Sequence, residues 1–203
     1  SKMRGDHRVT IVYFGDGGSS VGDCHEAMNF AAVHMLPIIF FCENNKYAIS
    51  VHISKQMAVE SVASRANGYN MRGICIDGTD IEEVYEATSE AALIARAGKG
   101  PTIVEAVVER YLPHTSDDDD LRYRTKKDIE NARERDPIGL LRNRLISAGF
   151  LSKNMDKKIQ ADALREVDQA TELVEREQYP HTDGFHNHVY AAHQTRAEEI
   201  QSP

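Results

Sequence analysis

The sequence contains no tryptophan and only three cysteines among its 203 residues. Cys24, Cys42 and Cys75 lack the spacing of a metal site or a redox pair, so we expect small buried hydrophobic residues in a reducing compartment. No apolar run reaches the ~18 residues that a membrane-spanning helix needs. No signal or transit pattern precedes the first apolar segment. We therefore expect no membrane partner.

Basic side chains are also fewer than acidic ones. The chain has 24 Lys and Arg against 32 Asp and Glu, which gives a formal net charge of −8. This balance argues against a nucleic-acid partner and favours plain solubility. The length is sufficient for one globular domain with a sizeable core.

The stretch from residue 9 to residue 50 has the clearest organisation. Residues 9–14 are apolar and rich in β-branched and aromatic side chains, which predicts a buried strand. A glycine turn follows at residues 15–18, and a helix is expected from about Gly22 to Met35. Residues 38–42 then predict a second buried strand. Two parallel strands joined by a helix form a βαβ unit.

Polar residues follow both strands of this unit. Asp16 comes directly after the first strand, and Asn44 and Asn45 follow the second. Ligands of parallel sheets bind beyond the carboxyl ends of the strands, where a helix N-terminus also attracts phosphate. The glycines allow positive φ and a close approach of the backbone to a ligand. Oxygen ligands beside a phosphate suit Mg²⁺.

Residues 15–17 read Gly-Asp-Gly, and Asn44-Asn45 follow after the intervening residues 18–43. This pattern resembles the thiamine diphosphate motif of thiamine-dependent enzymes. The resemblance implies that Mg²⁺ is held by Asp16, Asn45 and the main-chain carbonyl of Tyr47, and that Mg²⁺ holds the cofactor diphosphate. It also implies that the cofactor lies against a turn lined by Gly15, Gly17 and Gly18. The alternative is an ordinary βαβ turn without a ligand.

The rest of the chain predicts further strands and helices. A helix is expected at 57–66, strands at 73–76 and 102–108, and between them a helix that Thr79 or Asp80 caps and that ends near Arg96. This alternation predicts an α/β fold with a parallel doubly wound sheet. A long loop is expected at 109–124, followed by helices at 126–135, from Pro137 to about 149, and at 156–178.

These patterns predict three regions: an α/β domain at 1–125, a helical extension of it at 126–180, and a tail at 181–203. The tail is rich in histidine. One interpretation of these histidines is a transition-metal site, but their spacing fits no standard site. The preferred interpretation is a tail of uncertain order. The histidines are His181, His186, His188 and His193.

The loop at 109–124 contains a second pattern, in which His114 precedes four consecutive aspartates and the pair Tyr123-Arg124. It resembles the regulatory loop of 2-oxo acid dehydrogenase alpha subunits, with the acidic run closest to the branched-chain type. The resemblance implies that His114 reaches the cofactor diphosphate and acts at the reacting side. A solvated loop histidine is the alternative. The aspartates could be ordered by ion pairs with Arg110, Arg122 and Arg124.

The family resemblance implies the alpha subunit of a decarboxylating component that contains thiamine diphosphate and Mg²⁺. It implies oxidative decarboxylation of a 2-oxo acid, of branched-chain type, with acyl transfer to a lipoyl-bearing acyltransferase. It further implies activity only with a beta subunit, in an α2β2 heterotetramer whose cofactor lies between the subunits. In this family, additional chain precedes the first strand found here.

Three other interpretations remain open. The substrate could be pyruvate or acetoin rather than a branched-chain 2-oxo acid. The chain could be a transketolase-like fragment, although His114 and the acidic loop argue against this. It could also be a non-catalytic fragment or assembly module with the same fold. The expected location is the cytoplasm of a bacterium, or the mitochondrial matrix in a eukaryote.

Overall fold

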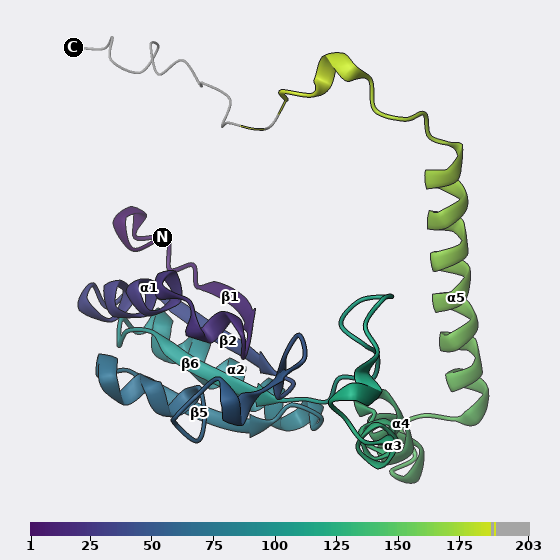
Figure 1. Cartoon of the computed structure of the whole chain (residues 1–203), viewed down its shortest axis with the longest axis horizontal. Coiled ribbons are helices and arrows are strands. Elements are labelled where there is room, and N and C mark those ends of the chain that lie inside the picture. The colour runs from purple at the N-terminus through teal and green to yellow at the C-terminus, as the bar shows by residue number, and fades with distance from the viewer. Residues whose placement is uncertain (188, 190–203) are drawn as a thin grey trace. The chain divides into compact units, whose positions relative to one another are not determined.

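The computed structural model describes residues 1–187 and residue 189, which fall into two compact units (Figure 1). The first unit is formed by residues 1–151 and the second begins at Ser152. The second contains helix α5 (Lys153–Arg176) and a short 3-10 helix, η6 (Thr182–Gly184). Much of the expected tail at 181–203, with His188 and His193, lies outside the described residues.

The first unit is built on a four-stranded sheet whose neighbours are all parallel, in the order β1-β2-β6-β5. This confirms the predicted α/β fold with a parallel doubly wound sheet. A small antiparallel pair, β3 and β4, follows β2. The strands are β1 (Thr10–Gly15), β2 (Ile38–Asn44), β3 (Tyr47–Ala48), β4 (Val51–His52), β5 (Arg72–Asp77) and β6 (Thr102–Val107).

Helices cover both faces of the sheet because the central strands are apolar on both sides. Alternate side chains of β2 and β6 point to opposite faces, as the period of a strand requires. On one face Phe40 and Ile103 pack with Met28 of α1 (Gly22–Val33) and with η4 (Ala63–Tyr69). On the other face Phe41 and Val104 pack with α2 (Ile81–Arg96).

The helix starts follow from capping residues that the sequence shows. The Asp80 side chain accepts hydrogen bonds from the first-turn N–H groups of α2, and Asp136 does the same for α4 (Pro137–Ser147). Thr125 and Asp128 form a reciprocal capping box at the start of α3 (Lys126–Glu134). The short 3-10 segments are η1 (Lys2–Arg4), η2 (Gly18–Ser20), η3 (Ile53–Lys55) and η5 (Asp120–Arg122).

The expected helix at 57–66 is wrong. The only helix there is the 3-10 helix η4, which begins later, at Ala63, and ends at Tyr69, after which Asn70 has a left-handed conformation. The backbone N–H of Ala63 donates to the buried carboxylate of Glu105, so a contact distant in sequence replaces the bond that an α-helix would make. The apolar spacing was nevertheless informative, since Val62 and Ala66 are buried.

Two burial expectations also differ from the structure. Strand β1 was expected to be buried, but it is an edge strand without a second neighbour among the described residues, and 59% of Tyr13 is exposed. Cys75 is exposed, whereas Cys42 is buried as expected. Within the described residues no helix has the length and apolar character needed to cross a bilayer.

Candidate functional site

Asp16, Asn45 and Tyr47 come together at the carboxyl end of the sheet through a chain of hydrogen bonds. Asp16 follows β1, and the backbone N–H groups of Asp16 and Asn45 lie close enough to its carboxylate to favour the ionised form. The Asn45 side-chain oxygen accepts from the backbone N–H of Tyr47 at 3.0 Å. Three residues from two segments therefore form one polar group at the predicted edge.

The Asp16 carboxylate is buried and only partly satisfied. The residue is 1% exposed, and its Oδ2 atom has no hydrogen-bond partner among the described residues. Burial raises the pKa of Asp16, while the N–H groups and the Arg110 guanidinium oppose this shift. A buried carboxylate oxygen without a partner is costly unless a cation or donor completes it. This arrangement fits a bound Mg²⁺, which prefers oxygen ligands.

The main chain of the glycine turn is held by side chains from outside it. The Asp16 carbonyl accepts hydrogen bonds at 2.6 Å from the Ser19 hydroxyl and from Nε2 of Gln56. Arg65 donates to the Ser19 carbonyl and, at 3.0 Å, to its hydroxyl. Helix α1 then begins without a side-chain cap, because its N-cap residue is Val21. A helix start without a side-chain cap suits a phosphate group.

The turn does not use the positive φ that its glycines allow, because Gly15, Gly17 and Gly18 are not among the described residues with positive φ. Gly17 has φ −60°. Its place is instead set by close packing, since a Cβ there would lie 2.9 Å from the Cβ of Ala48 in β3. The glycine therefore lets the β3–β4 hairpin, which contains Tyr47, lie against the Asp16 turn.

We expect Gly17→Ala to displace this hairpin and weaken Mg²⁺-dependent cofactor binding by ~10-fold or more, as loss of support around a metal ligand typically does. Calorimetric titration measures the change. Gly68→Ala is the matched control, because a Cβ at Gly68 meets no atom within 4 Å and the φ there is not positive. Equal affinities for the two variants would contradict this role of Gly17.

The two asparagines have different roles. Asn44 is buried, and its side-chain amide donates to Glu105 Oε1 at 2.6 Å while its oxygen accepts from the Lys46 N–H at 2.9 Å. Asn45 is thus the member of the pair beside Asp16. Sequence analysis missed Glu105, Gln56 and Arg65. Only Glu105 left a signal, as the single acid within the apolar strand β6.

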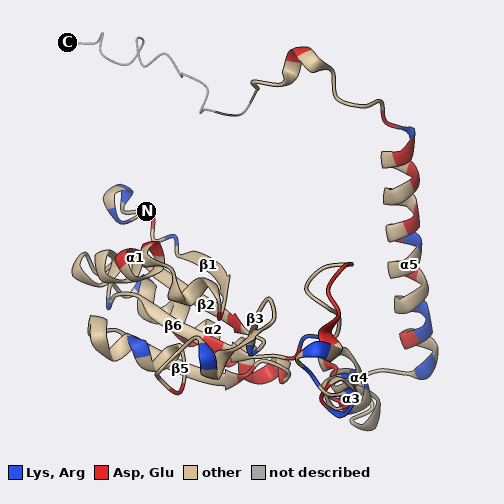
Figure 2. Ribbon diagram, in the orientation of Figure 1, with Lys and Arg blue, Asp and Glu red and all other residues tan. Residues whose placement is uncertain are grey.

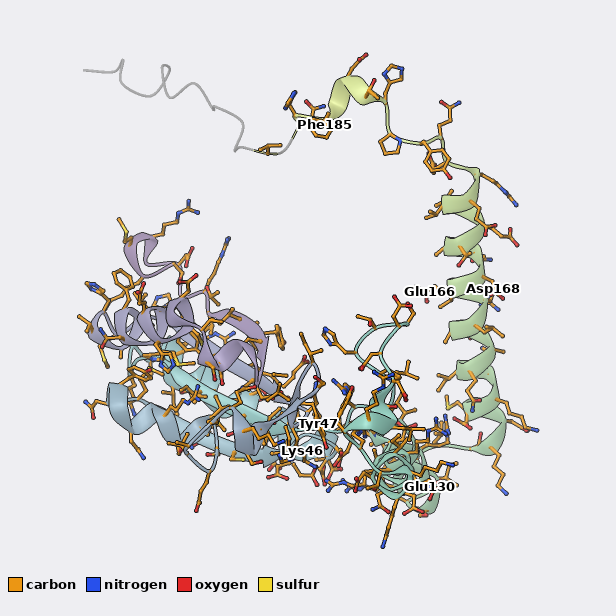
Figure 3. All side chains as sticks on the ribbon, viewed as in Figure 1. Lys46, Tyr47, Glu130, Glu166, Asp168 and Phe185 are labelled. Carbon is orange, nitrogen blue, oxygen red and sulfur yellow. The ribbon has the colours of Figure 1, made fainter. Side chains whose placement is uncertain are left out.

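Tyr47 lies at the carboxyl end of the sheet, on the side of the loop that follows β6 (Figure 3). Guanidinium groups of Arg110 and Arg124 lie 5.4 and 5.6 Å from its ring centroid, within cation–π range. The Tyr123 ring lies 5.6 Å away, centroid to centroid. Beside Tyr47 is a polar cavity of about 530 Å³ that Lys46 and Arg124 also line.

The loop after β6 contains a run of acidic residues (Figure 2), and its own side chains order it. Asp118 Oδ2 accepts hydrogen bonds from the Tyr123 hydroxyl at 2.5 Å and from the His114 backbone N–H at 2.8 Å. These two bonds hold the pKa of Asp118 below its ordinary value. The loop thereby connects to Tyr47 through Tyr123.

The expected ion pairs within the loop form in part. Arg124 pairs with Asp120 at 3.3 Å, and Arg122 pairs with Asp119 at 3.5 Å. Arg110 instead donates to the Tyr123 hydroxyl. His114 is exposed, and no hydrogen bond among the described residues joins its side chain to Asp16 or Asn45. The structure therefore brings together the three predicted metal ligands but not His114.

Of the tail histidines, His181 and His186 are described. His181 lies 3.1 Å from Asp183, and both side chains are highly exposed. In the part of the chain that the structure describes, no cluster of three or more His, Cys, Asp or Glu side chains could hold a metal. The candidate magnesium site would instead use one carboxylate with amide and main-chain oxygens.

Comparison with known proteins gives one family. Residues 1–183 match the family model described as "Dehydrogenase E1 component". The 2-oxoisovalerate dehydrogenase subunit alpha of Bacillus subtilis is 44% identical over 90% of this chain and 56% of its own length. The 3-methyl-2-oxobutanoate dehydrogenase subunit alpha of Mycobacterium tuberculosis is 44% identical over 76% of this chain and 42% of its own.

A pyruvate dehydrogenase E1 component subunit alpha from Bacillus subtilis is also similar, with 43% identity over 87% of this chain and 48% of that relative. The chain thus spans about half the length of the curated relatives it matches.

Proposed function

Because the chain belongs to the dehydrogenase E1 component family, we propose that it forms part of the alpha subunit of a thiamine diphosphate-dependent 2-oxo acid dehydrogenase. The proposed reaction is the oxidative decarboxylation of a 2-oxo acid with transfer of the acyl group to a lipoyl group. The observation that supports it best is the buried Asp16 carboxylate, whose free oxygen lies in the same polar group as Asn45 and Tyr47.

In this proposal Asp16, Asn45 and the Tyr47 carbonyl hold Mg²⁺, and the diphosphate lies beside the turn of Gly15, Gly17 and Gly18. Arg65 and the uncapped start of α1 add positive potential there. When bound, thiamine diphosphate supplies the nucleophilic carbon on which 2-oxo acid decarboxylation depends. The protein's own contribution is to bind and orient this group.

His114 is proposed to act at the reacting side of the site. Its exposure is consistent with a loop that faces a ligand and a second subunit, and Asp118 and Tyr123 hold the loop in place without using the imidazole. An imidazole can donate a hydrogen bond to developing negative charge or accept a proton near neutral pH.

The partners follow from the same proposal. A beta subunit completes the cofactor site in an α2β2 heterotetramer, and a lipoyl-bearing acyltransferase accepts the acyl group. The proposed location is the bacterial cytoplasm, since the similar proteins named above are bacterial, or the mitochondrial matrix if the source is eukaryotic.

Branched-chain 2-oxo acids are the proposed substrates. The two proteins at 44% identity are named for 2-oxoisovalerate and 3-methyl-2-oxobutanoate, and the acidic loop at 117–120 resembles the same type. Pyruvate is the second candidate, because a pyruvate dehydrogenase alpha subunit is similar at 43% identity.

The test is a substrate panel for the full-length protein produced with its beta subunit. With a lipoyl acceptor present, release of CO₂ from 3-methyl-2-oxobutanoate and from pyruvate and release of acetaldehyde from acetoin are compared, each with and without thiamine diphosphate. We expect the highest kcat/KM for 3-methyl-2-oxobutanoate and no turnover without cofactor. A preference for pyruvate selects the second candidate, and no turnover of any substrate contradicts the proposed function.

A further inference from the structure

Glu105 is a buried acid for which the proposed chemistry has no direct use. It is 1% exposed, and it lies in the apolar central strand β6 between Cys42 of β2 and Cys75 of β5 in register. Burial of a carboxylate among apolar and thiol side chains is costly unless hydrogen bonds compensate it. Its position in the centre of the sheet therefore requires an explanation.

Both oxygens of Glu105 hold elements at the edge of the candidate site. Oε1 accepts from the Asn44 side-chain amide at 2.6 Å, and Oε2 accepts from the Ala63 backbone N–H at 2.7 Å. The first bond reaches the end of β2 and the second reaches the start of η4. One side chain thus ties two segments that are adjacent to Asp16.

The bond to Asn44 determines how the following turn is held. With its amide on Glu105, the Asn44 oxygen accepts from the Lys46 N–H, and Lys46 has φ 72°, a left-handed conformation that is unfavourable for a residue with a side chain. The turn places the Asn45 N–H on the Asp16 carboxylate. If Asn44 rotated, this support for the Lys46 conformation would be lost.

We propose that Glu105 is a positioning residue for the metal site, which acts by holding Asn44 so that the turn presents Asn45 and the Tyr47 carbonyl beside Asp16. The inference rests on the proposed function. Glu105 also places a second negative charge behind the site. A charge felt at Asp16 also attracts a cation.

The test uses the full-length protein assembled with its beta subunit. Binding of thiamine diphosphate is titrated at several Mg²⁺ concentrations, and thermal unfolding is recorded without either ligand. For Glu105→Gln we expect Mg²⁺-dependent affinity to fall by ~10–100-fold, the usual effect of losing an outer-sphere partner of a metal ligand. Glu43→Gln, on the exposed neighbouring position of β2, controls for loss of charge alone and is expected to bind normally.

A second variant separates positioning from simple support of the fold. In Glu105→Gln the new amide can accept from only one of its two donors, and we expect its oxygen to stay on the fixed Ala63 N–H, so that its NH2 group faces the Asn44 amide and Asn44 loses its acceptor. Combining it with Asn44→Asp reverses the polarity of the pair, because a carboxylate at position 44 accepts from the new amide and still accepts from Lys46. We expect the double variant to recover most of the lost affinity, which is the coupling that a double-mutant cycle measures.

Other outcomes overturn the inference. If Glu105→Gln binds thiamine diphosphate as tightly as the wild type, whatever its melting temperature, Glu105 supports only the fold. In that case, loss of binding in Asp16→Asn in the same assay leaves the proposed function intact. Failure of the double variant to recover affinity contradicts the route through Asn44. Absence of cofactor binding by the wild-type assembly contradicts the proposed function itself, and the inference with it.

Discussion

Asp16→Asn is expected to reduce Mg²⁺-dependent binding of thiamine diphosphate by at least ~100-fold, beyond the ~10–100-fold typical of an outer-sphere residue. The carboxylate supplies the charged ligand of the proposed site. Its Oδ2 atom is buried and has no partner among the described residues, so the neutral amide removes a metal ligand without breaking a bond at that atom. Calorimetric titration of the assembled protein measures the loss.

The same substitution is expected to leave the ligand-free fold equally or more stable at pH 7. Burial raises the folded-state pKa of Asp16, so the fold favours the protonated carboxyl. The stability that this preference contributes is complete at pH values below the unfolded-state pKa and is lost as pH rises through the folded-state pKa. At neutral pH the ionised carboxylate therefore destabilises the fold, and the amide removes this effect. Thermal unfolding without ligand tests this expectation.

Asp77 is the matched control, because it also ends a parallel strand and precedes a glycine. Its oxygens are already used: Oδ1 accepts from Thr79 and Oδ2 from Arg135. Burial opposes ionisation, but these partners outweigh it and lower the pKa of Asp77. Asp77→Asn should lower stability by up to about 1 kcal/mol, as for a partly exposed ion pair, and leave cofactor binding unchanged. Loss of cofactor binding in Asp77→Asn, with normal binding in Asp16→Asn, would contradict the assignment of Asp16.

His114→Ala is expected to lower kcat by ~10²–10³-fold, the range found when one stabilising donor is removed from a reacting centre. Cofactor affinity should fall less than kcat, because Asp118 binds the loop through the His114 backbone N–H, which the substitution keeps. Steady-state kinetics with 3-methyl-2-oxobutanoate, combined with cofactor titration, separates the two quantities.

His34→Ala is the control for this experiment, since His34 packs on Phe30 at the end of α1, the opposite end from the glycine turn. It should retain wild-type kinetics. A His114→Ala protein with unchanged kcat would assign this side chain to the surface and remove it from the proposed chemistry. A protein with unchanged kcat at saturation but a weakened cofactor affinity would assign it to binding alone.

Local sequence signals predicted the parts of the fold that depend on local physics. Apolar β-branched runs gave the parallel strands, and Asp80, one of the two candidate caps, gave the start of α2, because a cap acts on N–H groups two or three residues away. The spacing of Asp16 from Asn45 also placed both residues at one edge, since parallel strands end at the same side of a sheet.

Features that depend on contacts between distant segments could not be predicted in this way. Glu105 reaches Asn44 and Ala63, and the second of these contacts accompanies a 3-10 helix where apolar spacing had indicated an α-helix. The role of Gly17 was likewise hidden, because it depends on Ala48 rather than on positive φ. Arg65 and Gln56 gave no signal in isolation, since polar residues in a loop are ordinary.

A magnesium site formed by Asp16, Asn45 and Tyr47 makes the binding of thiamine diphosphate depend on Mg²⁺. Thiamine diphosphate is titrated into the assembled wild-type protein with Mg²⁺ present and again after Mg²⁺ is removed by a chelator. We expect binding with Mg²⁺, strong weakening without it, and no difference between the two conditions for Asp16→Asn. Equal binding with and without Mg²⁺ in the wild-type protein would contradict the magnesium site.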